Sequence, residues 1–328
     1  MRADPTLCAS LRLAGGRRLG YAITGPDDGT PVLYCHGAIG TPLGGSVDLD
    51  AITSELGVRH IAVNRPGIGT SDRAPGRTVL DFARDIRELV DALAVERFAM
   101  VGVSAGGPYG LAIARELADR VDGVALCSSL SPLCAPHRAP GMDRRMRLAL
   151  AALARAPDLW AGIGDALLPM IRRHPRLITA VIAAHAARSE RARVLAPDEQ
   201  ASASASFLDA AAFGVRGMID DYSVACSGWG FSPADVEAEV HLWHGVRDPL
   251  VPIEHALQLA ITLPRCRVFF DPDEGHHFFR SRLRTILAVL IGRDAHPATS
   301  LDHARTMAGD GGIRVPGRRR LGRLRARP

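Results

Sequence analysis

The chain has 328 residues, of which 47% are hydrophobic, so it is long enough for one large α/β domain or two smaller ones. Its formal net charge of +5 comes from the C-terminal end, because residues 296–328 contain eight arginines and only two aspartates, and the rest is close to neutral. The six cysteines are scattered without metal-ligand spacing, and the N-terminus has no apolar signal core. These features argue against a cysteine metal site and a secreted protein, and predict a cytoplasmic protein with reduced thiols. The uncharged run 98–114 contains glycines and a proline, which argues against a membrane span.

Strands and helices alternate over the first part of the chain. A hairpin is expected at 7–24, strands at 32–35, 60–64, 98–101 and 121–127, and helices at about 47–56 and after Thr78. This alternation predicts a parallel sheet covered by helices on both faces. The loop that begins at His36 is rich in glycine and directly follows a strand, and such a loop can turn backbone N–H groups into a shared cavity. We expect His36 to shape this loop rather than to transfer protons.

The sequence Gly102-Val-Ser-Ala-Gly106 lies between the strand that begins at Phe98 and a helix that tolerates Pro108 in its first turn. A serine at such a sharp strand-to-helix bend adopts a strained backbone and exposes its hydroxyl above the sheet. Gly102 and Gly106 leave out the side chains that would collide there. The helix N-terminus directs unpaired N–H groups toward developing negative charge. Ser104 is therefore the candidate nucleophile; the alternative is a glycine-rich turn with an idle serine.

Strand patterns disappear between residues 133 and 227, where Ala-, Arg- and Leu-rich helical stretches predominate. We interpret this segment as an all-helical insertion into the α/β body. An insertion just past the carboxyl edge of a sheet can roof a pocket; the alternative is that its Ala-rich stretches only pack helices together. Its residues Trp160, Met170 and Phe213 are expected to pack between helices rather than to line that pocket. Alternation then resumes, with strands at 240–243 and 266–270 and helices at 254–262 and up to residue 292.

The expected organisation is thus a core in two parts, residues 1–132 and 228–295, separated by the insertion 133–227 and followed by a basic, disordered tail, 296–328. We expect the arginine-rich tail to be a solvated extension; the alternative is a weak contact with an anionic surface. No aromatic residue lies among these arginines, so we expect no nucleic-acid partner.

A serine hydroxyl needs a base that takes its proton and a third group that holds the base. Ser104, Asp248 and His276 each follow a predicted strand, where parallel sheets place their functional sites. The order Ser, Asp, His along the chain is one of the known orders of such triads.

The sequence resembles the α/β-hydrolase fold superfamily, in particular serine hydrolases that carry a helical cap. The resemblance covers about residues 10–292 except the insertion, and its marks are His36-Gly37, Arg65-Pro-Gly-Ile-Gly-Thr-Ser-Asp72, Gly102-Val-Ser-Ala-Gly106, Trp243-His-Gly-Val-Arg-Asp248 and Gly275-His276. It implies an eight-stranded, mostly parallel sheet and no cofactor or metal.

The resemblance also implies site roles: Ser104 as nucleophile, His276 as base and then acid, and Asp248 as the group that orients the imidazole. The backbone N–H groups of Ala38 and Ala105 would form the oxyanion hole. Three alternatives stay open at this point. His277 is a rival to His276, and Asp271 and Asp273 are rivals to Asp248, although both lie in the histidine's own loop.

The predicted function is hydrolysis of small-molecule carboxylic esters through an acyl-enzyme. Epoxide hydrolases and haloalkane dehalogenases of this fold carry aspartate at the serine's position, so Ser104 favours acyl transfer instead. The alternatives are a perhydrolase or carbon–carbon bond hydrolase with the same triad, or a ligand-binding member of the fold without turnover. An unperturbed histidine base, with a pKa of about 6.5, predicts loss of activity below that pH.

Overall fold

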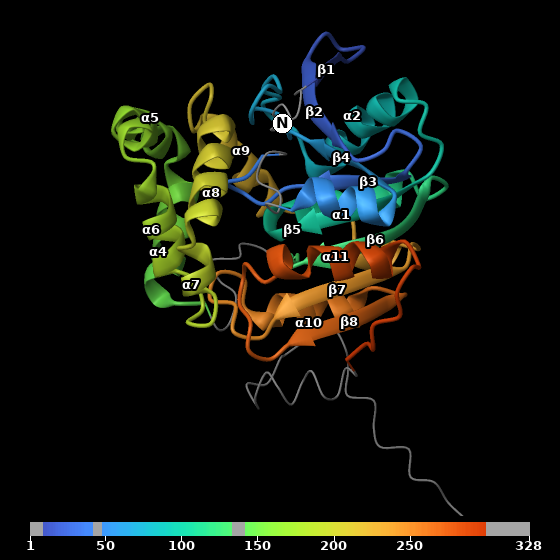
Figure 1. Ribbon diagram of the computed structural model, residues 1–328. Helices are drawn as coiled ribbons and strands as arrows, with labels where there is room; N and C mark the ends of the chain where they lie inside the picture. Colours follow the sequence, from blue (N-terminus) through green and yellow to red (C-terminus); the bar gives the residue numbers. More distant parts are fainter. Residues whose placement is uncertain (1–8, 42–47, 133–141, 300–328) are drawn as a thin grey trace, which may run out of the picture.

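The computed structural model describes residues 9–41, 48–132 and 142–299. Its centre is an eight-stranded sheet with the spatial order β1-β2-β4-β3-β5-β6-β7-β8 (Figure 1). β1 and β2 are antiparallel, as are β2 and β4, whereas all other neighbours are parallel, which confirms the predicted fold class. The strands are β1 (Ala9–Arg12), β2 (Arg18–Thr24), β3 (Thr30–Cys35), β4 (Val58–Val63), β5 (Phe98–Val103), β6 (Val121–Cys127), β7 (Val240–Gly245) and β8 (Cys266–Asp271).

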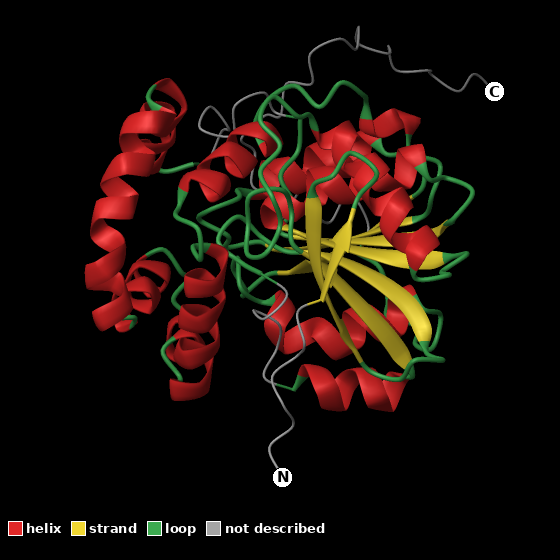
Figure 2. Ribbon diagram, turned by 90° about the horizontal axis from the view of Figure 1, so that it is seen from above, coloured by secondary structure: helices red, strands yellow, loops and turns green. Residues whose placement is uncertain are grey.

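Helices cover both faces of the sheet (Figure 2). Buried residues of α2 (Val79–Ala92), α3 (Gly107–Glu116) and α10 (Ile253–Thr262) form one core cluster with the sheet. The second cluster joins the other face to α1 (Leu49–Leu56) and α11 (Phe279–Leu290). Every residue of the central strand β5 is buried, which explains why it reads as a continuous apolar run.

Local signals account for the helix ends. Thr78 caps α2 in a capping box: its hydroxyl oxygen accepts from the backbone N–H of Asp81, whose carboxylate accepts from the N–H of Thr78. Gly57 ends α1 with φ of 54°, a left-handed conformation that glycine adopts without steric penalty. Both ends lie where the sequence predicts them.

Between β6 and β7, residues 142–227 are mainly helical, and we call them the helical insertion. It stands beside the sheet on the left of Figure 1. Ile68 of the core is buried with residues of the insertion such as Leu168 and Met218, so the two parts share a third apolar cluster. The helices are α4 (Arg144–Arg155), α5 (Pro157–Arg173), α6 (Arg176–Ala184), α7 (Arg191–Val194), α8 (Pro197–Ala210) and α9 (Arg216–Ala225).

The predicted packing of Trp160, Met170 and Phe213 is wrong: these side chains are 38%, 47% and 78% exposed. The buried side of α5 is formed by Ala161 and Leu168, seven residues apart and therefore on one helix face. Trp160 and Met170 point to other sides of the helix.

The first residues of the predicted tail pack against the core. Residues 296–299, expected in the tail, lie along β8: the imidazole of His296 packs beside Trp243, and the N–H of Thr299 donates to Val268 O at 2.6 Å. The rest of the predicted tail, 300–328, lies outside the described residues, as do Cys8 and Cys134. None of the helices in the described ranges combines the length and the apolarity that crossing a bilayer requires.

Candidate active site

Ser104 occupies the strained bend between β5 and α3. Its φ is +53°, in the left-handed region that side chains disfavour. A Cβ added to Gly106 would lie 2.3 Å from Cys35 O, and one added to Gly102 would lie 3.0 Å from Gly106 O. A side chain at Gly106 would therefore collide with the end of β3, and one at Gly102 would be tightly crowded, in agreement with the motif.

Asp248 and His276 meet across two loops that follow β7 and β8. Asp248 Oδ2 accepts a hydrogen bond from His276 Nδ1 at 2.7 Å. The other oxygen, Oδ1, accepts from the backbone N–H groups of Leu250 and Val251 at 2.8 and 2.9 Å, which fixes the carboxylate plane. β5, β7 and β8 run parallel, so the structure brings the loops of Ser104, Asp248 and His276 to the same edge of the sheet.

The two groups shift each other's pKa. Burial disfavours the charged form of His276, but the charge and hydrogen bond of Asp248, helped by Glu190, outweigh it and raise the pKa of His276 above 6.5. Burial likewise opposes ionisation of Asp248, yet His276 lowers the pKa of this carboxyl below its ordinary value. A reaction that needs neutral His276 should therefore lose its rate on acidification at a pH above 6.5, and not at the pKa of an unperturbed histidine.

The rival residues have other partners. The backbone N–H of His277 donates to Glu190 Oε1 at 2.7 Å, and burial, followed by the neighbouring His276, lowers the pKa of His277 to about 3. Asp271 pairs with Arg282, and Asp273, whose side chain is 74% exposed, pairs with Arg247. The geometry therefore favours His276 and Asp248.

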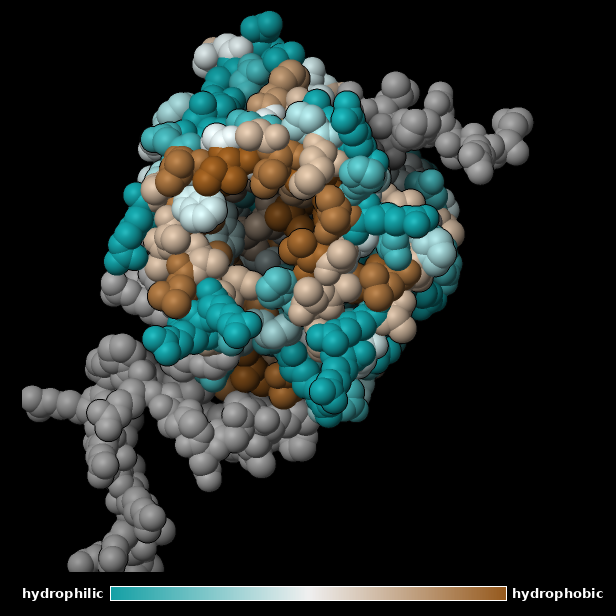
Figure 3. All heavy atoms as spheres, turned by 90° about the vertical axis from the view of Figure 1, so that its left-hand side faces the viewer, coloured by the Kyte–Doolittle hydropathy of each residue, from teal (hydrophilic) through white to brown (hydrophobic). Residues whose placement is uncertain are grey.

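A cavity of about 370 Å³ lies at this edge, and both Ser104 and His276 line it. Core residues and the helical insertion contribute to its wall, which is mostly apolar and includes Leu130, Leu150, Val181 and Ile182. Figure 3 shows a hollow framed largely by hydrophobic residues on the side of the molecule where the insertion lies. Among the polar lining residues, Arg280 is paired with Glu199 at 2.6 Å.

The loop after β3 also borders the cavity. Gly37 and Ala38 line it, and a Cβ added to Gly37 would lie 3.5 Å from Ser104 Cβ, so the backbone passes directly beside the serine. His36 is buried, and its Nδ1 lies 2.8 Å from Gly37 O. A carbonyl oxygen can only accept, so Nδ1 carries the proton and His36 shapes the loop, as expected. Ala105 is buried at the bend itself.

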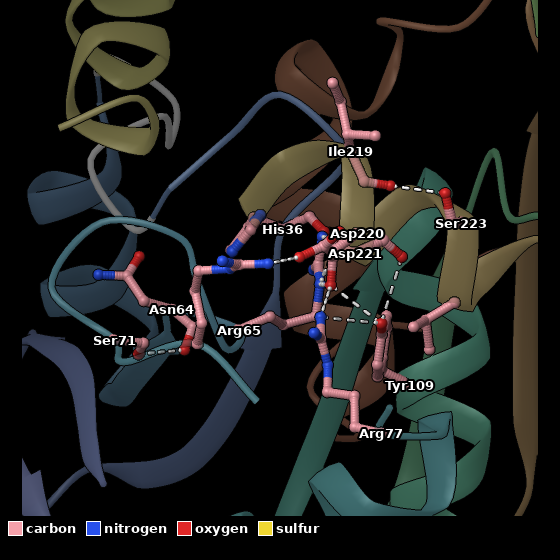
Figure 4. A network of polar contacts seen from close by, with 12 residues as sticks. His36, Asn64, Arg65, Ser71, Arg77, Tyr109, Ile219, Asp220, Asp221 and Ser223 are labelled. Carbon is pink, nitrogen blue, oxygen red and sulfur yellow. Dashed lines mark hydrogen bonds and ion pairs between the residues drawn. The ribbon is translucent and has the colours of Figure 1, made fainter. Parts of the chain in front are cut away.

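A buried polar network that was not predicted from the sequence lies next to this loop (Figure 4). Arg65, which follows β4, and Asp221 of α9 are both fully buried and paired at 2.8 Å, and Arg77 and Tyr109 bind the same carboxylate. Arg65 belongs to a motif quoted above, but nothing in the sequence around Asp221 identifies it as the partner.

Glu190, in the insertion between α6 and α7, was missed as well. Its carboxylate is buried against the backbone of His277 and contributes to the raised pKa of His276. Across the described ranges, no group of three or more His, Cys, Asp or Glu side chains is arranged to hold a metal ion.

Known proteins resemble this chain in sequence and in fold. A Variovorax paradoxus protein named "Putative carbamate hydrolase RutD" is 36% identical over 140 residues, 42% of this chain and 52% of that protein. Haloalkane dehalogenase 2 of Mycobacterium tuberculosis is 38% identical over 105 residues, 30% of this chain and 36% of that protein. The matches thus span about half or less of these relatives. The esterase EaEST from Exiguobacterium antarcticum has a similar structure, with a TM-score of 0.63 and 18% identity over 87% of this chain and all of that one.

The family assignment rests on a longer match. The profile described as "alpha/beta hydrolase fold" matches residues 30–282, which is well over half of the chain and includes every candidate site residue named above. The protein belongs to the alpha/beta hydrolase fold family.

Proposed function

We propose that this protein is a serine hydrolase that cleaves carboxylic esters through an acyl-enzyme. One observation carries the proposal: the strained Ser104 and His276 border the same largely apolar cavity, and His276 is hydrogen-bonded to Asp248. Serine at the bend, rather than aspartate, favours an acyl intermediate over the alkyl-ester chemistry of dehalogenases. An esterase of similar structure is consistent with this choice.

In the proposed first half-reaction, Ser104 Oγ attacks the ester carbonyl carbon while its proton passes to His276 Nε2. Asp248, on the opposite ring nitrogen, keeps Nε2 free to accept that proton and stabilises the imidazolium that forms. The carbonyl oxygen becomes an oxyanion, which the N–H groups of Ala38 and Ala105 stabilise. The tetrahedral intermediate then collapses, and His276 returns the proton to the departing alkoxide.

In the second half-reaction, water attacks the acyl-enzyme. His276 takes a proton from the water, a second tetrahedral intermediate forms in the same oxyanion hole, and its collapse releases the carboxylic acid. His276 gives the proton back to Ser104 Oγ, so the enzyme is regenerated without a net change. The helical insertion acts as a cap in this proposal: its residues Leu150, Val181 and Ile182 provide apolar surface for the acyl or alcohol part of the substrate.

The test is hydrolysis of p-nitrophenyl esters from acetyl to dodecanoyl by the wild type and Ser104→Ala. Ser227→Ala, an exposed serine at the end of the insertion, is the matched control. We expect turnover by the wild type and the control, and a loss in kcat of about 10³-fold or more in Ser104→Ala. Peracid formation in hydrogen peroxide and cleavage of a vinylogous diketone are measured in parallel. Failure to hydrolyse any ester, or full activity in Ser104→Ala, contradicts the proposal.

A further inference from the structure

Arg65 has an unusual set of partners for a buried arginine. Its side chain is fully buried, and its Nε and Nη2 donate to the carboxylate of Asp221 at 2.8–3.0 Å. The other N–H groups of the guanidinium bind acceptors outside the ion pair: Nη1 donates to His36 O, and Nη2 also donates to Gly37 O at 3.1 Å. Arg65 therefore connects α9 of the insertion to two successive carbonyl groups of the loop beside Ser104. Figure 4 shows Arg65 with Asp221 and His36.

Gly37 O is held by three donors. It accepts from Arg65 Nη2 at 3.1 Å, from the protonated Nδ1 of His36 at 2.8 Å, and from the backbone N–H of Gly40 at 3.4 Å. Burial and the charge of Arg65 lower the pKa of His36 to about 3, so this imidazole stays neutral and keeps a single proton, on Nδ1. Together these donors fix the rotation of the peptide unit to which the carbonyl belongs, and Arg65 is the one that comes from outside the loop.

The same peptide unit contains the N–H of Ala38. There is no cis peptide bond among the residues that the structure describes, and the C=O and N–H of a trans peptide point in opposite directions. Fixing Gly37 O toward Arg65 thus directs the N–H of Ala38 away from it, on a backbone that runs beside Ser104. We propose that Arg65 is a positioning residue, which orients the oxyanion-hole N–H of Ala38 by holding the opposite end of its peptide, and that Asp221 holds Arg65 in place. This inference rests on the proposed function.

Arg77, a second arginine that binds Asp221, serves as the control for Arg65. Arg77 Nη2 donates to Asp221 Oδ1 at 2.7 Å and its side chain is only 5% exposed, but the hydrogen bonds of the described residues link it to Tyr109 and Asp221 and not to the loop. If the arginines served only to join the insertion to the core, replacing either would have similar consequences. If Arg65 orients the peptide of Ala38, only its replacement impairs stabilisation of the oxyanion.

The experiment compares Arg65→Met and Arg65→Lys with Arg77→Met. It measures kcat and KM on the best ester of the panel, and inhibition by a trifluoromethyl ketone, whose adduct with Ser104 carries an oxyanion. We expect Arg65→Met to lower kcat by about 10²–10³-fold, to change KM by less than about threefold, and to weaken the inhibitor by a factor similar to the loss in kcat. Arg77→Met should leave all three within about threefold.

Arg65→Lys covers the case in which Arg65→Met does not fold. It keeps a cation beside Asp221, but the three hydrogens of an ammonium cannot reproduce the planar set of donors that spans the carboxylate and both carbonyls. We expect a folded protein with kcat and inhibitor affinity both reduced by about tenfold or more. Unchanged kcat in Arg65→Lys, or equal losses in the Arg65 and Arg77 variants, overturns the inference while the ester hydrolase stands. A wild type without Ser104-dependent turnover overturns both.

Discussion

Replacing Asp248 by asparagine tests how the carboxylate controls His276. Oδ1 accepts two backbone N–H groups at 2.8 and 2.9 Å, and only an oxygen can accept them. In Asp248→Asn the amide oxygen must therefore take the Oδ1 position, and the NH₂ group faces His276 Nδ1 across the present 2.7 Å contact. Nδ1 then has to accept, which places the imidazole proton on Nε2. A histidine in that tautomer cannot take the proton of Ser104.

We expect kcat to fall by about 10⁴-fold, the loss that a wrong tautomer causes in a triad of this kind, which corresponds to about 5 kcal/mol of transition-state stabilisation. The assay is steady-state ester hydrolysis at neutral pH, with urea unfolding to confirm that the variant is folded. Asp273→Asn is the matched control, since this exposed aspartate lies in the loop of His276 and pairs with Arg247, and we expect no change. A folded Asp248→Asn enzyme with more than about a tenth of wild-type kcat refutes the tautomer argument.

Three further predictions concern the neighbouring residues. His277→Gln should keep kcat within about tenfold, because His276 and not His277 binds Asp248; a loss equal to that of His276→Gln would reverse the assignment. Glu190→Gln should shift the acid limb of the pH profile of kcat/KM to lower pH, because the Glu190 charge raises the pKa of His276; an unchanged or upward shift contradicts this. Gly106→Ala should destabilise the protein by about 1–3 kcal/mol or more in urea unfolding, since the added Cβ would lie 2.3 Å from a backbone carbonyl. Gly162→Ala, with open space around it in α5, should be neutral or stabilising, and equal destabilisation of the two would refute the steric argument.

The features that follow local rules could be predicted from the sequence. Strands buried on both faces read as short apolar runs, and Thr78 and Gly57 mark helix ends through their own hydrogen bonds and backbone conformation. The bend at Ser104 is equally local, because its glycines are required by atoms a few residues away or in the adjacent strand. The fold class and the placement of the site at one sheet edge follow from these elements.

Long-range polar partners could not be predicted. Arg65 and Asp221 are separated by 156 positions, and an aspartate in a surface helix, here one of the adjacent pair Asp220 and Asp221, is usually a solvated residue. Glu190 has no pattern around it that indicates contact with the histidine loop. The exposed Trp160 shows the same limit for apolar residues, since helical periodicity shows that a face is apolar but not whether another element covers it.

The most direct test of the central claim is to locate the nucleophile with a fluorophosphonate. Its phosphorus reacts with an activated serine oxygen and loses fluoride, and mass spectrometry of proteolytic peptides identifies the modified residue. The account predicts one adduct, on Ser104, formed rapidly by the wild type, much more slowly by His276→Gln, and not at all by Ser104→Ala. An unmodified wild type, or an adduct on another residue that persists in Ser104→Ala, would contradict it.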